Sequence, residues 1–404
     1  MQAHRRCPSR SADPHLTAPH VSCAQVADWS EQEADEYDEW RENFLADVCA
    51  ELTRHQHGIF VAAALGQMEA ARWQHLEAAL TAARFAADVI SAHAPRDAAL
   101  AADLQRLLAS ILAMPAQPTD AAAALLLAAK LRLCSAFAGL LADGGAPGTL
   151  EAAVHAAAIC LRQPLAAGDT ASRMGHCRMG HTAALQSLVH LVRVCSELIG
   201  ASPPLLDGVV MCLQQPLAPH QLRCRLLSEC SRCIAAAAHD GPPPALHALC
   251  APLFGELQQL AAKVEAGCEG GSAATLGHHI PQLVEALEAV GEAIRPLGPL
   301  GGATLGPMLT NLWPLWLRVA GLRGVEEQLL PPLQQLLRVV LRLIGLHFAP
   351  FLHATVGAIV DAFRRSCNPA AIDLASALLE ASPTSPPPHL PTCPPAHLPT
   401  CPPA

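Results

Sequence analysis

Three polar residues near the C-terminal end of the chain share one side of a predicted helix. Gln335, Arg338 and Arg342 follow one another at spacings of three and four residues, which places them on one helical face. Guanidinium groups form paired hydrogen bonds with the oxygens of phosphates and carboxylates. The spacing therefore indicates either an anion-binding face or a surface helix with solvated arginines, and it leaves both interpretations open.

Cysteines and histidines also gather in the sequence, but none of the groups completes a metal-ligand set. Cys230 and Cys233 form a C-x-x-C pair close to Cys224, and a zinc site would need a second pair or histidines nearby. Cys230 lies on an apolar helical face, which favours structural thiols. His176 and His181 belong to the repeated segment RMGHCRMGH, which could bind a soft metal, although a duplicated loop insert is our preferred interpretation. We predict neither a metal nor a cofactor.

The sequence contains no convincing enzymatic constellation. Neither the G-x-x-x-x-G-K-[ST] phosphate loop nor the G-x-S-x-G nucleophile elbow is present. Carboxylates gather mainly in residues 31–51, where a solvated helix face is the simpler interpretation and an acidic patch for a basic protein segment is the alternative. We therefore predict a binding protein rather than an enzyme.

The helix that must position the arginines has a strongly amphipathic pattern within residues 325–349. Six apolar residues recur there at i, i+3, i+4, i+7, i+8 and i+11, which predicts one stripe that packs on neighbouring helices. These residues are Leu333, Leu336, Leu337, Val340, Leu341 and Ile344. Pro331 and Pro332 suit the first turn of this helix, where a missing N–H costs little, and Gly345 suits its C-terminal end.

Similar stripes recur along the chain and are separated by short links rich in proline and glycine. The first stripe follows an acidic link, and we expect its helix to bury Trp40, Phe44, Leu45, Val48 and Leu52. A later helix begins after Asp97, which we expect to cap its N-terminus. Helix pairs of about 40 residues predict a HEAT-type solenoid, because each pair can bury its stripe only on neighbouring pairs. A compact helical bundle is the alternative.

The composition favours an all-α fold class and argues against several functions. Of the 404 residues, 51% are apolar but only 3% are aromatic, and the residues that strands favour are sparse. The net charge of −9 argues against direct nucleic-acid binding and is compatible with a basic protein partner. No uninterrupted apolar run is long enough to span a membrane, so we expect no membrane association.

We divide the chain into three segments. Residues 1–27 are polar and broken by prolines, which predicts disorder. Residues 28–381 carry the helical stripes and form the predicted α-solenoid of HEAT-like helix pairs. Residues 382–404 are a proline-rich tail in which the octapeptide HLPTCPPA occurs twice, and we expect this tail to be extended and without a packed core.

The order and spacing of several motifs resemble the karyopherin-β nuclear transport receptors. The piece YDEWRENFLADVCAEL resembles a family pattern in which two aromatics and an arginine start a helix, carried here by Tyr37, Trp40 and Arg41. The piece beginning at Trp73, WQHLEAAL, is similar to the next-helix pattern W-x-x-x-E-A-x-L. The block from LWPLW to AIDLASALLE is similar to later HEAT repeats of the transportin-SR and importin-thirteen branch, with transportin-SR the closer match. The resemblance spans about residues 35 to 380.

The resemblance implies a role for the arginine-bearing helix. In the transportin-SR branch, an arginine-rich helix with the pattern R-x-x-R-x-x-x-R binds phosphorylated arginine-serine cargo segments. Arg338 and Arg342 match the second and third positions, whereas Gln335 replaces the first arginine. A phosphoserine, with about −1.5 to −2 charges and three acceptor oxygens, suits such a pair of guanidinium groups.

From this resemblance we expect a nuclear import receptor for arginine-serine-rich or basic cargo, present in both cytoplasm and nucleus, with nucleoporins as further partners. The alternative is a HEAT-repeat scaffold in a static complex. Receptors of this family are longer, and this chain would correspond to the middle of one. The N-terminal arch that makes their main contacts with the GTPase Ran has no counterpart in this sequence, so binding of Ran is left open.

Overall fold

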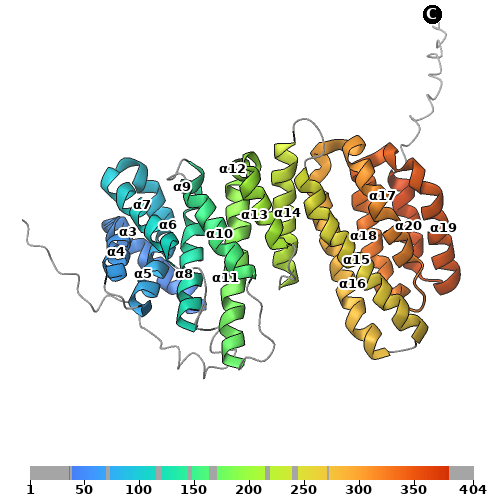
Figure 1. Ribbon diagram of the computed structural model, residues 1–404, viewed down its shortest axis with the longest axis horizontal. Helices are drawn as coiled ribbons and strands as arrows, with labels where there is room; N and C mark the ends of the chain where they lie inside the picture. The colour runs from blue at the N-terminus through green and yellow to red at the C-terminus, as the bar shows by residue number, and fades with distance from the viewer. Residues whose placement is uncertain are drawn as a thin grey trace, which may run out of the picture. The chain divides into compact units, whose positions relative to one another are not determined.

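The chain is described by a computed structural model that covers residue 36 and residues 39–69, 73–114, 121–143, 148–162, 171–213, 219–238, 244–270 and 273–381. Every regular element among these residues is a helix (Figure 1), so the predicted all-α fold class is confirmed. The predicted disordered segment 1–27 and the proline-rich tail 382–404 lie outside the described residues.

The chain divides into two compact units. Unit 1 comprises residues 1–255 and 292–299, and unit 2 comprises residues 256–291 and 300–404. The divisions fall inside two long helices, α15 (Pro244–Gly270) and α16 (Ala273–Ile294), and η4 (Arg295–Leu300) follows them.

Unit 1 packs its helices in two layers. In one layer α5, α8, α11 and α14 are successive neighbours, and in the other α4, α7, α10 and α13 are successive neighbours. Helices that follow one another, such as α4 with α5 and α10 with α11, pair across the layers, which is the arrangement of HEAT repeats. The elements of this part are η2 (Arg41–Leu45), α3 (Ala46–His55), α4 (Ile59–Glu69), α5 (Trp73–Phe85), α6 (Ala87–His93), η3 (Ala94–Arg96), α7 (Ala98–Ala113), α8 (Ala121–Ala136), α9 (Ala138–Ala142), α10 (Thr149–Arg162), α11 (Ala171–Val194), α12 (Ser196–Ala201), α13 (Pro203–Leu213) and α14 (His220–Ala237).

Three helices of the α5 layer break at one buried residue and continue as a short helix. Ala86, Phe137 and Cys195 separate α5 from α6, α8 from α9, and α11 from α12. All three residues are fully buried or nearly so and have φ between −90° and −99° with ψ between 3° and 25°. This sparsely populated backbone region turns the chain without a proline or glycine. The repeated break marks the helix pairs as structural repeats, although the three residue types differ.

Unit 2 repeats the same two-layer arrangement. α17 pairs with α18 and α19 pairs with α20, while α17 neighbours α19 and α18 neighbours α20. Two stacked tryptophans, Trp313 and Trp316, lie in its core with ring centroids 4.9 Å apart. Their indole N–H groups donate to the Thr355 hydroxyl and the Leu333 carbonyl. The elements are α17 (Gly301–Ala320), α18 (Glu326–Ile344), η5 (Gly345–Phe348), α19 (Ala349–Ser366) and α20 (Pro369–Ala381).

α18 is the amphipathic helix that the sequence predicts, and it begins earlier than expected. All six residues of its predicted apolar stripe are buried, and Gly345 follows its last residue with a φ of +50°. Pro331 and Pro332 lie inside the helix rather than in its first turn, because the helix begins at Glu326. Each proline deprives the carbonyl four residues earlier of its helical partner. Those carbonyls belong to Glu327 and Gln328, which are exposed, so water can solvate them.

Within the described residues, one long helical stretch, Glu326–Ser366, is strongly apolar. By length and composition alone this stretch could cross a membrane, with a mean hydropathy of 1.7 over its most apolar window, of which 22% is buried. Our expectation from uninterrupted runs missed it, because the average over the window stays high although His347, Pro350 and His353 interrupt the apolar residues. The stretch is two helices rather than one, since Gly345 ends α18 and η5 separates it from α19. The stretch is therefore weak evidence for a membrane span, because it is divided between two helices and the apolar stripe of α18 is already buried.

The first predicted apolar stripe has the helical spacing that we expected, but the prediction that this stripe is buried is wrong. Trp40, Phe44, Val48 and Leu52 are exposed, with Phe44 60% exposed, and Leu45 is half-buried. The helix instead buries Cys49 and Thr53 where α3 packs on α5 and α6. A hydrophobic period identifies the faces of a helix but does not say which face meets a neighbour.

Candidate functional site

The predicted arginine pair lies on the exposed face of α18. Arg338 and Arg342 are both exposed, as is Gln335, while the opposite face of the helix is buried in unit 2. Within the described part of the chain, neither guanidinium has a hydrogen-bond or ion-pair partner. The two groups are therefore available to an external anion, and Arg342, in the last turn, also suits the helix dipole.

Other arginines of unit 2 are already engaged by acidic groups. Arg318 on α17 pairs with Glu265 at 2.5 Å, and Arg365 on α19 lies 3.5 Å from a Glu326 carboxylate oxygen. Arg365 also donates to the Ala320 carbonyl at 3.0 Å. These ion pairs join neighbouring helices and have a structural role, which separates them from the α18 pair.

A second group of polar residues surrounds a cavity of about 390 Å³ in unit 1. We call it the polar cavity. It is formed by three successive helices of one layer, α5, α8 and α11, together with η2. The residues that give it its chemistry are Glu42, Arg84, Arg132, Ser135, Ser187 and His190. No sequence pattern identified this site, because its residues come from four elements that are far apart in the chain.

Hydrogen bonds hold several of these side chains in place. Arg84 donates to the Glu42 carboxylate at 2.5 Å, and its guanidinium lies 4.3 Å from the centroid of the Phe85 ring. His190 accepts a hydrogen bond at Nδ1 from the Arg193 guanidinium at 3.0 Å, which leaves Nε2 as the protonated nitrogen of the neutral ring. Burial, and secondarily the Arg193 charge, lower the pKa of His190. The neutral imidazole is therefore a hydrogen-bond donor at Nε2.

Ser187 is the unusual residue of the polar cavity. Its side chain is 1% exposed, and its hydroxyl has no hydrogen-bond partner within the described residues. A buried polar group without a partner costs about 1–3 kcal/mol and is rare in folded proteins. The hydroxyl can both donate and accept, so it is available to a group that enters the cavity.

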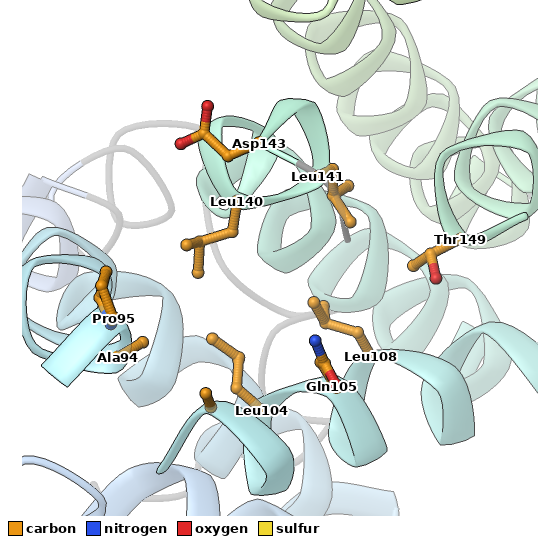
Figure 2. Close-up of a pocket in the computed structure, with 10 residues that line it drawn as sticks. Ala94, Pro95, Leu104, Gln105, Leu108, Leu140, Leu141, Asp143 and Thr149 are labelled. Atoms are coloured by element: carbon orange, nitrogen blue, oxygen red, sulfur yellow. The ribbon is translucent and has the colours of Figure 1, made fainter. Parts of the chain in front are cut away.

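A second cavity in unit 1, of about 380 Å³, is mainly apolar. Figure 2 shows Leu104, Leu108 and Leu140 pointing into a common space, whereas the Asp143 carboxylate points away from it. Asp143 and Thr149 flank residues 144–147, which lie outside the described residues. The lining offers apolar packing and little polar chemistry, so we assign no site to it.

The cysteine cluster consists of buried thiols. Cys230 and Cys233 on α14 are 0% exposed, and burial raises the pKa of both, that of Cys233 to about 12. Cys224, which is only half-buried, lies nearly two turns before Cys230 on α14, with its sulfur 3.3 Å from Nε2 of His220. Among the described residues, no three histidine, cysteine or acidic side chains are placed to hold a metal ion. High thiol pKa values also make these cysteines poor nucleophiles.

The RMGH repeat lies in a helix, which corrects our interpretation of it as a loop insert. It occupies the first part of α11, which begins at Ala171, and the side chains of residues 171–179 are not described. Its two glycines cost a helix about 1 kcal/mol each. The strongly apolar part of α11 that follows, with Leu185 and Leu188 fully buried, can sustain the helix despite this cost.

The acidic residues of segment 31–51 that the structure describes are exposed, which agrees with the simpler interpretation. They are Glu36 and Glu39, Glu42 on η2, and Asp47 and Glu51 on α3. They alternate along the chain with the exposed apolar residues of the stripe that includes Trp40. An apolar stripe with acidic edges can suit a basic, amphipathic protein segment.

Comparison with known proteins supports the fold. No protein-family model matches the sequence, and no curated protein matches it either. Among solved structures, importin-13 in its cytosolic state is similar to this chain, with a TM-score of 0.61 and 16% sequence identity. The match covers 89% of this chain and 38% of the importin-13 chain, so this chain spans less than two fifths of that protein's length. The chain has the HEAT-like α-solenoid fold of a karyopherin.

Proposed function

We propose that this chain is a cargo-binding part of a nuclear transport receptor of the karyopherin-β type, closest to its transportin-SR branch. It binds protein and carries out no enzymatic reaction. Two independent lines support the proposal: sequence motifs that resemble this family and a fold similar to that of importin-13. The observation that carries it is the pair of exposed guanidinium groups on α18, Arg338 and Arg342, which have no partner among the residues that the structure describes.

The binding mode follows from the geometry of α18. Residues four apart on a helix are neighbours on its surface, so Arg338 and Arg342 can both contact one phosphate. Each guanidinium can donate two parallel hydrogen bonds to phosphate oxygens, and the Gln335 amide can donate another. Exposed acids of the same unit, such as Glu327 in the first turn of α18, would attract the arginines of an arginine-serine segment. The expected cargo is therefore a phosphorylated arginine-serine-rich segment or another basic one.

The test compares phosphorylated and unphosphorylated arginine-serine peptides on the full chain. We expect Arg338→Ala/Arg342→Ala to weaken binding of the phosphorylated peptide about 10- to 100-fold, because charge-assisted contacts at an exposed site are partly screened. The matched control, Arg323→Ala/Arg364→Ala, removes two exposed arginines of unit 2 that lie outside α18. Equal affinities for both peptides and all variants would remove the phosphate-binding role of α18.

A HEAT-repeat scaffold in a static complex is the alternative. The exposed apolar residues of η2 and α3, and of α19 (Leu352, Val356, Val360 and Phe363), favour it, because such faces suit permanent interfaces. A transport receptor would reside in both cytoplasm and nucleus, bind nucleoporins and release cargo to Ran-GTP. We therefore expect added Ran-GTP to release bound cargo in a pull-down, provided that the chain carries enough of the Ran-binding region. A complex that is stable to Ran-GTP, formed by a chain that does bind Ran, favours the scaffold.

A further inference from the structure

We propose that the polar cavity is a second anion-binding site, which takes the phosphate or carboxylate of a side chain in a bound polypeptide. The site lies in unit 1 and uses none of the α18 residues. It extends the proposed function, because its ligand would belong to a bound protein segment.

Donor groups surround the cavity on three helices. Arg84 comes from α5, Arg132 from α8, and Ser187 and His190 from α11, whereas the Ser135 hydroxyl on α8 already donates to the Arg132 carbonyl. The neutral His190 ring presents Nε2–H as a donor, because Nδ1 accepts from Arg193. Glu42 is the single carboxylate in the lining. Such a set suits an anion with several acceptor oxygens and disfavours a metal cation, which the guanidinium groups would repel.

Ser187 supplies an independent reason to expect a ligand. Ser187 belongs to the lining of the cavity, and its hydroxyl is buried and has no partner within the described residues. A buried hydroxyl without a hydrogen bond lowers the free energy of unfolding. Proteins retain such unfavourable groups mainly at functional sites, where a ligand can supply the missing hydrogen bond. An anion in the cavity would accept the Ser187 hydrogen bond and remove this cost.

In the absence of a ligand, the Glu42 carboxylate pairs with the Arg84 guanidinium of the polar cavity. This carboxylate lies 2.5 Å from the Arg84 guanidinium, although the two residues belong to η2 and α5. The Glu42 side chain is about half exposed, so it can swing into solvent without unfolding a helix. We infer that an incoming anion displaces Glu42 from Arg84, and that Glu42 competes with the ligand.

The competition gives variants with opposite expected effects. Ser187→Ala removes one hydrogen bond to the anion and should weaken binding about tenfold. Glu42→Gln removes the competing charge and should tighten binding several-fold. Ser231→Ala is the matched control, because the Ser231 hydroxyl on α14 is also buried without a partner but does not line the cavity. Both serine variants should fold, since each replaces an unsatisfied hydroxyl with hydrogen.

The experiment titrates inorganic phosphate and three peptides that differ at one position, which is serine, phosphoserine or glutamate. Calorimetry is carried out at low salt on the full chain carrying Arg338→Ala/Arg342→Ala, so that the α18 face does not contribute. We expect phosphate and at least one of the two acidic peptides to bind, and comparison of those peptides identifies the source of the anion. The neutral peptide should bind at least tenfold more weakly.

Two results would overturn the proposal. One is that neither phosphate nor either acidic peptide binds, which would mean that water alone fills the cavity. The other is that Ser187→Ala and Ser231→Ala have the same affinity as the parent chain. These outcomes are independent of the proposed function, because binding that persists in the Arg338→Ala/Arg342→Ala background supports the cavity even if α18 binds no phosphate.

Discussion

The arginine face of α18 and the polar cavity present similar chemical groups in different surroundings. Arg338 and Arg342 lie on one helix, exposed to water, and the described part of the chain supplies no partner for either. Arg84 and Arg132 lie on different helices around a cavity, and Arg84 is held by Glu42. A solvated pair on one helix binds anions weakly and is sensitive to salt, whereas donors on several helices around one cavity can contact an anion from more than one side. The first surface suits a long, variable, highly charged segment and the second suits a single side chain.

The two units should differ most in their stability at alkaline pH. Unit 1 contains buried thiols whose pKa values are raised by burial, to about 11 for Cys195 and about 12 for Cys134, Cys233 and Cys250. In unit 2, Cys268 is half-buried and Cys367 is exposed. A raised folded-state pKa gives stability that is present below the unfolded value, near 9, and is lost as the pH rises through the folded value.

We therefore expect unit 1 to lose about 8 kcal/mol between pH 8 and pH 10, because six buried thiols with raised pKa values, Cys49 and Cys230 included, each contribute about 1.4 kcal/mol per pH unit above 9. Hydrogen exchange measured by mass spectrometry at both pH values, with correction for the intrinsic rate, reports each unit separately. Cys134→Ala is the control and should reduce the loss by one thiol's share. Equal losses in both units would contradict the assignment to the buried thiols.

Core truncations should separate the two binding surfaces. Leu337 lies behind the arginines of α18 and Leu185 lies on α11 near Ser187, and both are fully buried. Truncating either to alanine should cost about 3 kcal/mol. We expect Leu337→Ala to weaken binding of the phosphorylated arginine-serine peptide and Leu185→Ala to weaken binding of phosphate in the polar cavity. Calorimetry on both variants tests this, and loss of both activities in each variant would mean that the surfaces depend on one another.

The sequence predicted those parts of the structure that depend on spacing within one helix. The buried stripe of α18, its exposed arginines and the Asp97 cap of α7, which accepts from the Ala99 and Leu100 N–H groups, are local patterns of this kind. The helix breaks at Ala86, Phe137 and Cys195 share a backbone conformation but no residue type, so no motif marks them.

Long-range packing decided what the sequence could not. The Trp40 stripe has the same period as a buried one, and its exposure depends on which neighbours pack against α3. The polar cavity requires that Arg84, Arg132 and Ser187 meet, which depends on the order of α5, α8 and α11 in one layer. Neither the exposure of the Trp40 stripe nor the assembly of the polar cavity can be predicted from the spacing of residues that are close in the sequence.

The smallest expected effect is a pH dependence of peptide binding. It should appear at the polar cavity, which contains His190, and not at the arginine face of α18. Burial first, and the Arg193 charge second, lower the pKa of His190, so that the ring is neutral near pH 7. The charged groups around it are Glu42, Arg84, Arg132 and Arg193, and a bound carboxylate would favour its protonation. Binding of the glutamate peptide should therefore tighten about two- to threefold from pH 7 to pH 5.5, where that carboxylate is still ionised. His190→Gln should abolish this dependence, and binding of the same glutamate peptide to α18, which contains no histidine, should show none.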